Sequence, residues 1–231
     1  LIAFGLIGSA LCQYGYYTSI QYSNAAFATV LSYTAPVMIL VYTVVKERRA
    51  PRGYELAAVL LVALGAFSCA TQFKLGALHI APLALIWGLL SAVAFAFYTI
   101  TPQKLIQEYS LLPIVGWGMI LGGIVLALLC RPWTVAVTVN AHLFIMLAGV
   151  IFLGTICSFC FYQAGVSIVG GLAGSILSAA EPVTSVMIST LLLHVLFTSF
   201  DLAGFVMILT AIPLIAVGEH WSEKQVVSLR K

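Results

Sequence analysis

The sequence predicts an all-α membrane protein, and three observations on its 231 residues support this fold class. Hydrophobic residues make up 62% of the chain and charged residues only 7%, whereas soluble domains contain about 25% charged residues. The mean hydropathy is +1.12. Long apolar runs recur along the whole chain and alternate with short polar connections. This composition excludes a soluble globular enzyme and a disordered chain, and the basic residues are too sparse for a nucleic-acid-binding surface.

Eight apolar windows are each long enough to cross a bilayer, which takes about 20 residues in a helix. They cover residues 1–21, 24–45, 54–73, 81–100, 112–130, 142–167, 171–193 and 201–218. The connections between them are short and hold most of the charged residues, so no soluble domain fits between two spans. Only residues 219–231 have the composition of an ordinary protein surface, and we expect them to form a cytoplasmic tail.

Basic residues are distributed unevenly between the two sets of connections. Eight of the ten Lys and Arg residues fall on one side of the predicted spans, in the connection 46–52, at Lys104 and in the tail. Only Lys74 and Arg131 fall on the other side. Cytoplasmic loops are enriched in Lys and Arg. We therefore expect a multi-pass protein of the cell (plasma) membrane, with both termini of this chain in the cytoplasm.

The sequence also contains an internal repeat with an offset of 146 residues. Identical residues recur at this offset: Gly8 and Gly154, Tyr16 and Tyr162, Ser32 and Ser178, Pro36 and Pro182. The offset corresponds to five spans, an odd number, so the paired helices are predicted to cross the membrane in opposite directions. Inverted repeats of this kind are typical of secondary transporters, whose substrate sites lie near the membrane midplane at the repeat interface.

The repeat predicts a larger architecture than eight helices. The spans 81–100 and 112–130 have no partners upstream of the first span, so we expect two further helices before Leu1. Residues 1–73 would then be the last three helices of a first repeat, and residues 81–218 a complete five-helix second repeat. The eight transmembrane helices seen would be part of a 5+5 inverted-repeat transporter bundle.

Two segments resemble a known family. The segment 25–37 reads AAFATVLSYTAPV and is followed by Lys46–Glu47, and its counterpart 171–183 reads GLAGSILSAAEPV. Both resemble the EamA family of the drug/metabolite transporter superfamily. The resemblance implies ten helices in two inverted repeats that move small metabolites and often export amino acids. This chain departs from the family pattern at Leu193–His194, where the second repeat of the family has Gly-Glu, and the first repeat reads Lys46–Glu47.

Glu181 is the one acidic residue predicted near the bilayer centre, at position 11 of the 23 residues in the span 171–193. A charge there costs several kcal/mol. Pro182 cannot donate a hydrogen bond to the carbonyl of Ser178, and Pro36 has the same effect in the first half, so we expect helix kinks at both prolines. A protonated Glu181 can donate to the freed carbonyl, which suggests proton coupling. The alternative is a permanently neutral carboxyl group needed for packing.

Polar and aromatic side chains inside the predicted spans are candidates for substrate binding. These candidates are Gln13, Tyr17, Ser32, Trp87, Tyr98, Tyr162, Gln163 and Ser178. Aromatic rings beside a few amides and hydroxyls suit a largely apolar ligand pocket, although Tyr and Trp also populate membrane interfaces. Small and polar residues follow one face of the span 171–193 at helical spacing. Such a face either packs closely against another helix or lines a cavity.

The sequence therefore predicts a secondary transporter rather than an enzyme, because it lacks an H-E-x-x-H motif and a second acid in mid-span. We expect it to move an amino-acid-like or other neutral, zwitterionic or cationic small-molecule solute by alternating access. The expected partners are this solute and the lipid bilayer, with no nucleic acid, metal or cofactor. The alternative is a membrane scaffold or receptor-like bundle. Glu55, His142, His194 and Asp201 lie at span ends, where water is expected to reach them.

Overall fold

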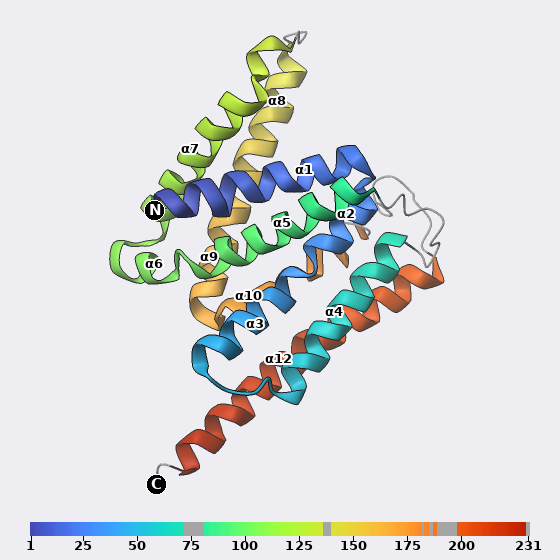
Figure 1. Ribbon diagram of the computed structural model, residues 1–231, viewed down its shortest axis with the longest axis vertical. Coiled ribbons are helices and arrows are strands. Elements are labelled where there is room, and N and C mark those ends of the chain that lie inside the picture. Colours follow the sequence, from blue (N-terminus) through green and yellow to red (C-terminus); the bar gives the residue numbers. More distant parts are fainter. Residues whose placement is uncertain (72–80, 136–139, 182, 185–186, 189–197, 230–231) are drawn as a thin grey trace.

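The computed structural model describes residues 1–71, 81–135, 140–181, 183–184, 187–188 and 198–229. All regular secondary structure in these ranges is helical, which confirms the predicted all-α class (Figure 1). The first half contains η1 (Phe4–Leu11), α1 (Cys12–Tyr22), α2 (Ala25–Ser32), α3 (Ala35–Glu47), α4 (Gly53–Thr71), α5 (Pro82–Ile100) and α6 (Gln103–Tyr109). The second half contains α7 (Leu111–Cys130), η3 (Pro132–Thr134), α8 (Ala141–Gly149), η4 (Val150–Cys157), α9 (Ser158–Val169), α10 (Gly171–Ser178) and α12 (Ser199–Leu229).

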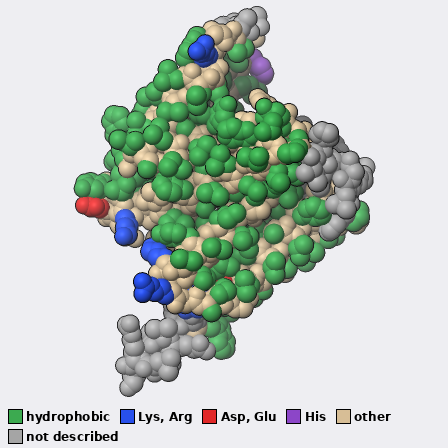
Figure 2. Space-filling model, in the orientation of Figure 1, with side chains coloured by type: hydrophobic (Ala, Val, Ile, Leu, Met, Phe, Trp, Pro, Cys, Tyr) green, Lys and Arg blue, Asp and Glu red, His purple; other side chains and the backbone are tan. Residues whose placement is uncertain are grey.

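The helices have the length and surface of membrane-spanning segments. Five helical segments among the described residues are long and apolar enough to cross a bilayer: Phe27–Glu47, Pro82–Tyr109, Leu111–Cys130, Ala141–Val169 and Leu202–Glu219. A shorter apolar helix covers Gly53–Cys69. Figure 2 shows that hydrophobic side chains cover most of the visible face, while Lys and Arg side chains stand at its margins. Such an apolar exterior is suited to lipid rather than to water.

Local sequence signals explain where several helices begin. The Asn24 side chain accepts a hydrogen bond of 2.8 Å from the Phe27 backbone N–H and so caps α2. Asn140 caps α8 in the same way, with 2.8 Å to the Leu143 backbone N–H. Pro82 is the first residue of α5, a position where the missing proline N–H costs nothing.

The predicted second span is interrupted between α2 and α3. The Thr34 backbone N–H and hydroxyl both donate to the Leu31 carbonyl, and the Val37 backbone N–H turns back to the Thr34 carbonyl. Pro36 has no N–H for the carbonyl of Ser32, which would be its partner in a regular helix. In the second half α10 ends at Ser178. Pro182 lies outside the described residues.

Two π-helical segments lie at positions related by the 146-residue offset: Phe4–Leu11 and Val150–Cys157. Each runs directly into an α-helix, α1 or α9. In η4, the Thr155 hydroxyl donates to the Val150 carbonyl at 3.0 Å and the Ser158 hydroxyl donates to the Leu153 carbonyl at 2.9 Å, both five residues back. Because π-helical segments are rare and frequently occur at functional sites, we expect η1 and η4 to lie near the functional site of this protein.

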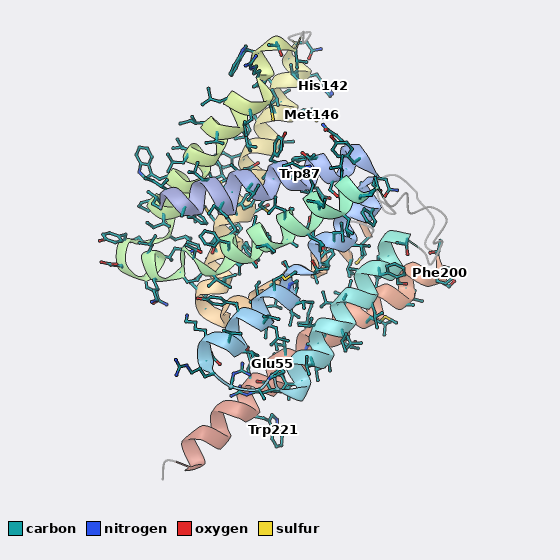
Figure 3. All side chains as sticks on the ribbon, in the orientation of Figure 1. Glu55, Trp87, His142, Met146, Phe200 and Trp221 are labelled. Atoms are coloured by element: carbon teal, nitrogen blue, oxygen red, sulfur yellow. The ribbon has the colours of Figure 1, made fainter. Side chains whose placement is uncertain are left out.

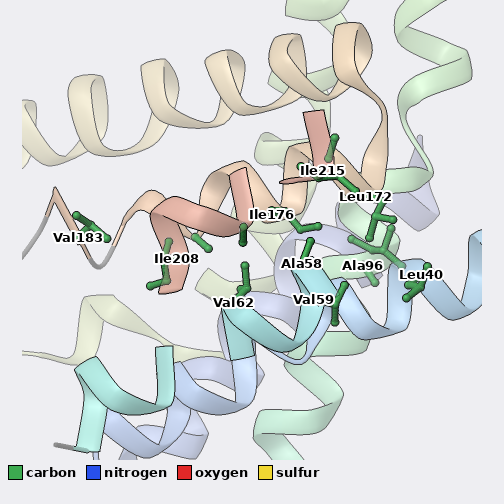
Figure 4. Close-up of a cluster of buried hydrophobic side chains, with 14 of the residues drawn as sticks. Leu40, Ala58, Val59, Val62, Ala96, Leu172, Ile176, Val183, Ile208 and Ile215 are labelled. Atoms are coloured by element: carbon green, nitrogen blue, oxygen red, sulfur yellow. The ribbon is translucent and has the colours of Figure 1, made fainter. Parts of the chain in front are cut away.

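The largest cluster of buried apolar side chains joins α4, α10 and α12. Ala58 and Val62 of α4 pack with Ile176 of α10 and with Ile208 and Ile215 of α12 (Figure 4). Over most of its length α4 runs alongside α12 (Figure 1). This cluster holds the last helix of the chain against the first half.

The close approach of α4 and α12 depends on two glycines that face each other. A Cβ atom on Gly65 would lie 2.8 Å from the Gly204 carbonyl oxygen, and one on Gly204 would lie 2.7 Å from the Gly65 carbonyl oxygen. Small residues allow helix backbones in membranes to approach in this way.

A second group of helices forms around α5. Helix α1 lies along α5, η1 contacts both α5 and α7, and α9 packs against α10, α7 and η4 (Figure 1). In Figure 1 the far ends of α7 and α8 extend away from the rest of the bundle. The side chains of η1, α1, α5, η4, α9 and α10, together with those of α2, α3 and α4, leave a space between them.

Candidate functional site

A cavity of about 1010 Å³ occupies this space. Its walls come from η1, α1, α2, α3 and α4 within residues 1–71, and from α5, η4, α9 and α10 within residues 81–181. The lining residues outside the predicted site include Ser9, Cys12, Tyr16, Thr29, Tyr33, Cys69, Ser91, Phe95, Thr155, Ser158, Phe159 and Ser175. Both π-helical segments contribute to the wall, which therefore combines aromatic rings, hydroxyls and small residues.

Many lining residues are related by the 146-residue offset. Pairs at this offset in which both members line the cavity are Gly8 and Gly154, Ser9 and Thr155, Cys12 and Ser158, Gln13 and Phe159, Tyr16 and Tyr162, Thr29 and Ser175, and Ser32 and Ser178. The two parts of the chain thus contribute equivalent positions to one cavity.

Most of the residues predicted to bind substrate lie in the cavity wall. Those that line it are Gln13, Tyr17, Ser32, Tyr98, Tyr162 and Ser178, together with the predicted coupling residue Glu181 and with Pro36. They come from α1, α2, α3, α5, α9 and α10, with Glu181 just after α10, and lie far apart in the sequence. The fold brings them together.

Trp87 and Gln163 are not among the lining residues. The Trp87 ring packs edge-on against the Tyr14 ring, with centroids 5.3 Å apart, so it joins α5 to α1 (Figure 3). Gln163 is fully buried, and its amide group is part of a hydrogen-bond network between α9 and α5.

The Gln163 network compensates for a proline. Pro102 has no N–H to donate to the Tyr98 carbonyl, its partner in a regular helix. Instead, the Gln163 amide Nε2 donates to that carbonyl at 2.8 Å. The Gln103 amide Nε2 donates to Gln163 Oε1 at 2.7 Å and to the Thr99 carbonyl at 3.1 Å. The network fixes α9 to the end of α5 directly behind the cavity wall.

Tyr98 lies at the centre of a group of aromatic rings. Its ring centroid is 5.0 Å from that of Phe4, 5.6 Å from Phe159 and 6.3 Å from both Phe95 and Tyr162. Apart from Phe4, all of these residues line the cavity. One part of the wall is therefore a packed aromatic surface formed by α5 and α9.

The hydroxyl groups of the lining tyrosines differ in their partners. The Tyr162 hydroxyl forms a hydrogen bond of 2.8 Å with the Thr99 hydroxyl, and the Tyr16 hydroxyl one of 3.1 Å with the Thr29 hydroxyl. The Tyr98 hydroxyl is buried and has no hydrogen-bond partner among the described residues. A buried hydroxyl without a partner is costly unless another molecule pairs with it.

Glu181 is the only Asp, Glu, Lys, Arg or His side chain among the described residues that line the cavity. Glu181 as a whole residue is exposed. Among the parts of the chain that the structure describes, no three His, Cys, Asp or Glu side chains group as metal ligands would. The charge in the cavity wall thus depends on one carboxyl group.

Water does not reach Glu55, contrary to the expectation for a residue at a span end. Glu55 is 3% exposed and accepts hydrogen bonds of 2.8 and 2.6 Å from the Arg49 guanidinium and of 2.8 Å from the Arg52 backbone N–H. Arg49 also pairs with Glu47. The hydrogen bond with Glu55 raises the pKa of Arg49 above its ordinary value. This cluster joins the end of α3 to the start of α4.

The other span-end residues differ from Glu55. His142 is exposed near the tip of α8, toward the opposite end of the molecule from Glu55 (Figure 3). His194 and the side chain of Asp201 lie outside the described residues.

Several lining residues are not among the predicted site residues, although the internal repeat contains a signal for them. Thr29 and Ser175, and Ser9 and Thr155, are pairs of hydroxyl residues at the 146-residue offset. A search for polar residues at matching positions of the repeat finds them. Phe95 and Phe159 have no such signal, because phenylalanine is common throughout an apolar helix.

Comparison with known proteins agrees with the sequence and the fold. Residues 1–71 and 82–217 match the EamA-like transporter family. An inner membrane transporter of Salmonella typhimurium (strain LT2), called YicL and described as uncharacterized, is 36% identical over 217 residues, which cover 94% of this chain and 72% of YicL. A protein of known crystal structure superposes with a TM-score of 0.74 at 15% identity, over 94% of this chain and 75% of that one, and so shares the fold.

The family match covers nearly all of the apolar helices, and the YicL relative is itself a protein of the inner membrane. Both agree with the predicted multi-pass protein of the plasma membrane. The chain therefore belongs to the EamA-like transporter family of membrane transporters.

Proposed function

We propose that the cavity is the substrate site of a secondary transporter that works by alternating access. The observation that supports this most strongly is the wall itself, to which the two parts of the chain contribute residues at equivalent positions. A site between two structural repeats can open to either side of the membrane when one repeat rocks against the other. The solute is a small metabolite that is amino-acid-like or otherwise neutral, zwitterionic or cationic.

The proposed architecture is a 5+5 inverted repeat. Residues 1–73 supply three helices of one repeat and residues 81–218 the five helices of the other. The two π-helical segments and the breaks after Ser32 and Ser178 support this division, since each pair is related by 146 residues. The excess of Lys and Arg in alternate connections supports cytoplasmic positions for both termini of this chain and for residues 219–231.

The proposed site residues are those that line the cavity, with Glu181 as the coupling residue. Gln13, Tyr17, Ser32, Tyr98, Tyr162 and Ser178 would contact the solute. Gln163 would act by holding Tyr98 and α9 in position, and Trp87 by holding α1 on α5. Pro36 and Pro182 would kink their helices beside the site. A carboxyl group in a water-accessible cavity can exchange a proton as the protein changes its open side.

Counterflow in proteoliposomes tests the transport function. Vesicles containing the purified protein are loaded with unlabelled L-phenylalanine and phenethylamine, and the entry of each radiolabelled compound is followed. We expect saturable entry that exceeds the rate in empty vesicles. Ser178→Trp, which fills the cavity, should abolish this entry, while Leu177→Trp on the exposed neighbouring position should preserve it. Equal entry with both variants would contradict transport through this cavity.

The coupling role of Glu181 needs a separate measurement. Counterflow in the presence and absence of a pH gradient should show a rate that depends on the gradient. Glu181→Gln should remove this dependence, because its amide cannot exchange a proton, while Glu108→Gln on the exposed end of α6 should leave it intact. A pH dependence that persists in Glu181→Gln rules out Glu181 as the coupling group.

A further inference from the structure

We propose that the cavity selects solutes that combine a positive charge with a flat aromatic ring, as in an arylalkylamine. This inference rests on the proposed function, since it names the substrate class of the same cavity. Two features of the wall support it: the sign of its charge and its aromatic surface.

The charge in the wall is negative. Glu181 supplies a carboxyl group, and no described lining residue is a Lys, Arg or His. An anionic solute would therefore leave water without a counter-charge, which is costly in surroundings of low polarity. A solute with an ammonium group instead pairs with the Glu181 carboxylate through a charge-assisted hydrogen bond.

A backbone carbonyl beside the cavity lacks the N–H donor that it would have in a regular helix. Pro36 and Ser32 both line the cavity, and Pro36 cannot donate to the carbonyl of Ser32. This carbonyl oxygen is an acceptor at the break between α2 and α3. Interrupted membrane helices commonly present such carbonyls to cations. An ammonium group has donors for both the carboxylate and the carbonyl.

The aromatic surface suits a ring of the solute. Phe95, Tyr98, Phe159 and Tyr162 line the cavity, and their ring centroids lie 5.5 to 6.3 Å apart where they are neighbours. Aromatic rings prefer offset-stacked or edge-to-face contacts with one another. The same rings attract a cation that lies over their faces. A planar ring that bears an ammonium group satisfies both preferences.

The cavity is large enough for such a solute. Tyr98 lines it, while the Tyr98 hydroxyl oxygen is itself buried in the wall. The volume of about 1010 Å³ leaves ample room for an amine built on one or two rings.

Binding of a matched series to the purified full chain in detergent tests the inference. The probes are phenethylamine, L-phenylalanine, phenylacetate and hexylamine, measured by isothermal titration calorimetry. The first three share a ring and differ in charge, while hexylamine keeps the charge without the ring. We expect phenethylamine to bind most tightly, hexylamine roughly tenfold more weakly, L-phenylalanine more weakly than phenethylamine, and phenylacetate not to bind. Tighter binding of phenylacetate, equal binding of all four probes, or no binding of any probe would overturn the inference.

Two pairs of variants locate the selectivity in the cavity. Glu181→Gln should weaken phenethylamine binding by about tenfold or more and reduce the preference over phenylacetate, whereas Glu108→Gln should not. Tyr98→Leu removes a ring from the aromatic surface and should weaken phenethylamine binding severalfold, whereas Tyr109→Leu on the exposed end of α6 should not. Wild-type selectivity in both Glu181→Gln and Tyr98→Leu would also overturn the inference.

Flux measurements separate this inference from the proposed function. If phenethylamine binds as expected but is not transported in proteoliposomes, the inferred binding preference of the cavity is correct and the proposed transport function is wrong. If phenylacetate is transported faster than phenethylamine, the transport function stands and the inference fails.

Discussion

Gln163 on α9 donates a hydrogen bond of 2.8 Å to the Tyr98 carbonyl on α5. Pro102 cannot donate to this carbonyl, because proline has no backbone N–H. The Gln163 side chain thereby replaces a backbone hydrogen bond that is missing at the end of α5. The bond lies directly behind the aromatic wall of the cavity, so the position of Tyr98 depends on α9. The position of Tyr98 in the cavity wall and the packing of α9 on α5 are therefore coupled through one amide group.

Replacement of Gln163 tests this bond. Gln163→Leu leaves the buried Tyr98 carbonyl without its partner and leaves Gln103 Nε2 with the Thr99 carbonyl alone. We expect a loss of about 1–2 kcal/mol in the free energy of unfolding. Reversible unfolding in mixed detergent micelles measures it. Gln107→Leu on the exposed face of α6 should change the stability little. Equal stability of Gln163→Leu and the wild type would show that the network contributes nothing.

The cluster around Glu55 predicts a clear difference between two glutamates that bind the same arginine. Glu55 is 3% exposed and accepts three hydrogen bonds, whereas the Glu47 side chain is 53% exposed. We expect Glu55→Gln to destabilise the protein by about 1–2 kcal/mol, because Arg49 is partly solvated and retains Glu47. Glu47→Gln should cost less than about 0.5 kcal/mol. Thermal unfolding of the two variants in detergent makes the comparison, and the reverse order would refute this role for Glu55.

Close packing of η1 on α7 predicts an effect of a single methyl group. A Cβ atom on Gly118 would overlap the Phe4 ring, which is fully buried, while the space around Gly123 on the same helix is open. We expect Gly118→Ala to destabilise the protein by about 1–3 kcal/mol, since neighbouring side chains or η1 must shift. Gly123→Ala should be neutral or slightly stabilising, because alanine favours helix. Chemical unfolding of both variants, monitored by tryptophan fluorescence, compares them, and a neutral Gly118→Ala would show that η1 moves freely.

Much of the helical architecture could be predicted from the sequence because apolar length is a strong signal. Each of the eight windows contains a described helix, although the structure divides the windows 1–21, 24–45 and 142–167 into shorter helical segments and describes the window 171–193 only in part. Residues Ser32 and Ser178 were assigned to the site from the repeat and helical spacing, and both line the cavity. These features depend on local sequence and on an offset that can be read directly.

Other features depended on contacts that local sequence does not encode. The π-helical segments Phe4–Leu11 and Val150–Cys157 consist of apolar and small residues that are equally compatible with an α-helix. A buried amide needs a partner, and the sequence does not indicate that Gln163 finds one in the Tyr98 carbonyl, which Pro102, 61 residues before Gln163, leaves without its helical donor. Burial of Glu55 follows from the fold of the 48–52 loop over α4, which composition alone did not indicate.

The most direct test of the central claim is the accessibility of Ser178→Cys from each side of the membrane. The variant is made in a chain whose five cysteines are replaced, and a membrane-impermeant thiol reagent is applied separately to right-side-out and inside-out vesicles. Alternating access predicts labelling from both sides, with Leu177→Cys as the control outside the cavity wall. Labelling from one side only, under every substrate and pH condition, would contradict a transport path through this cavity.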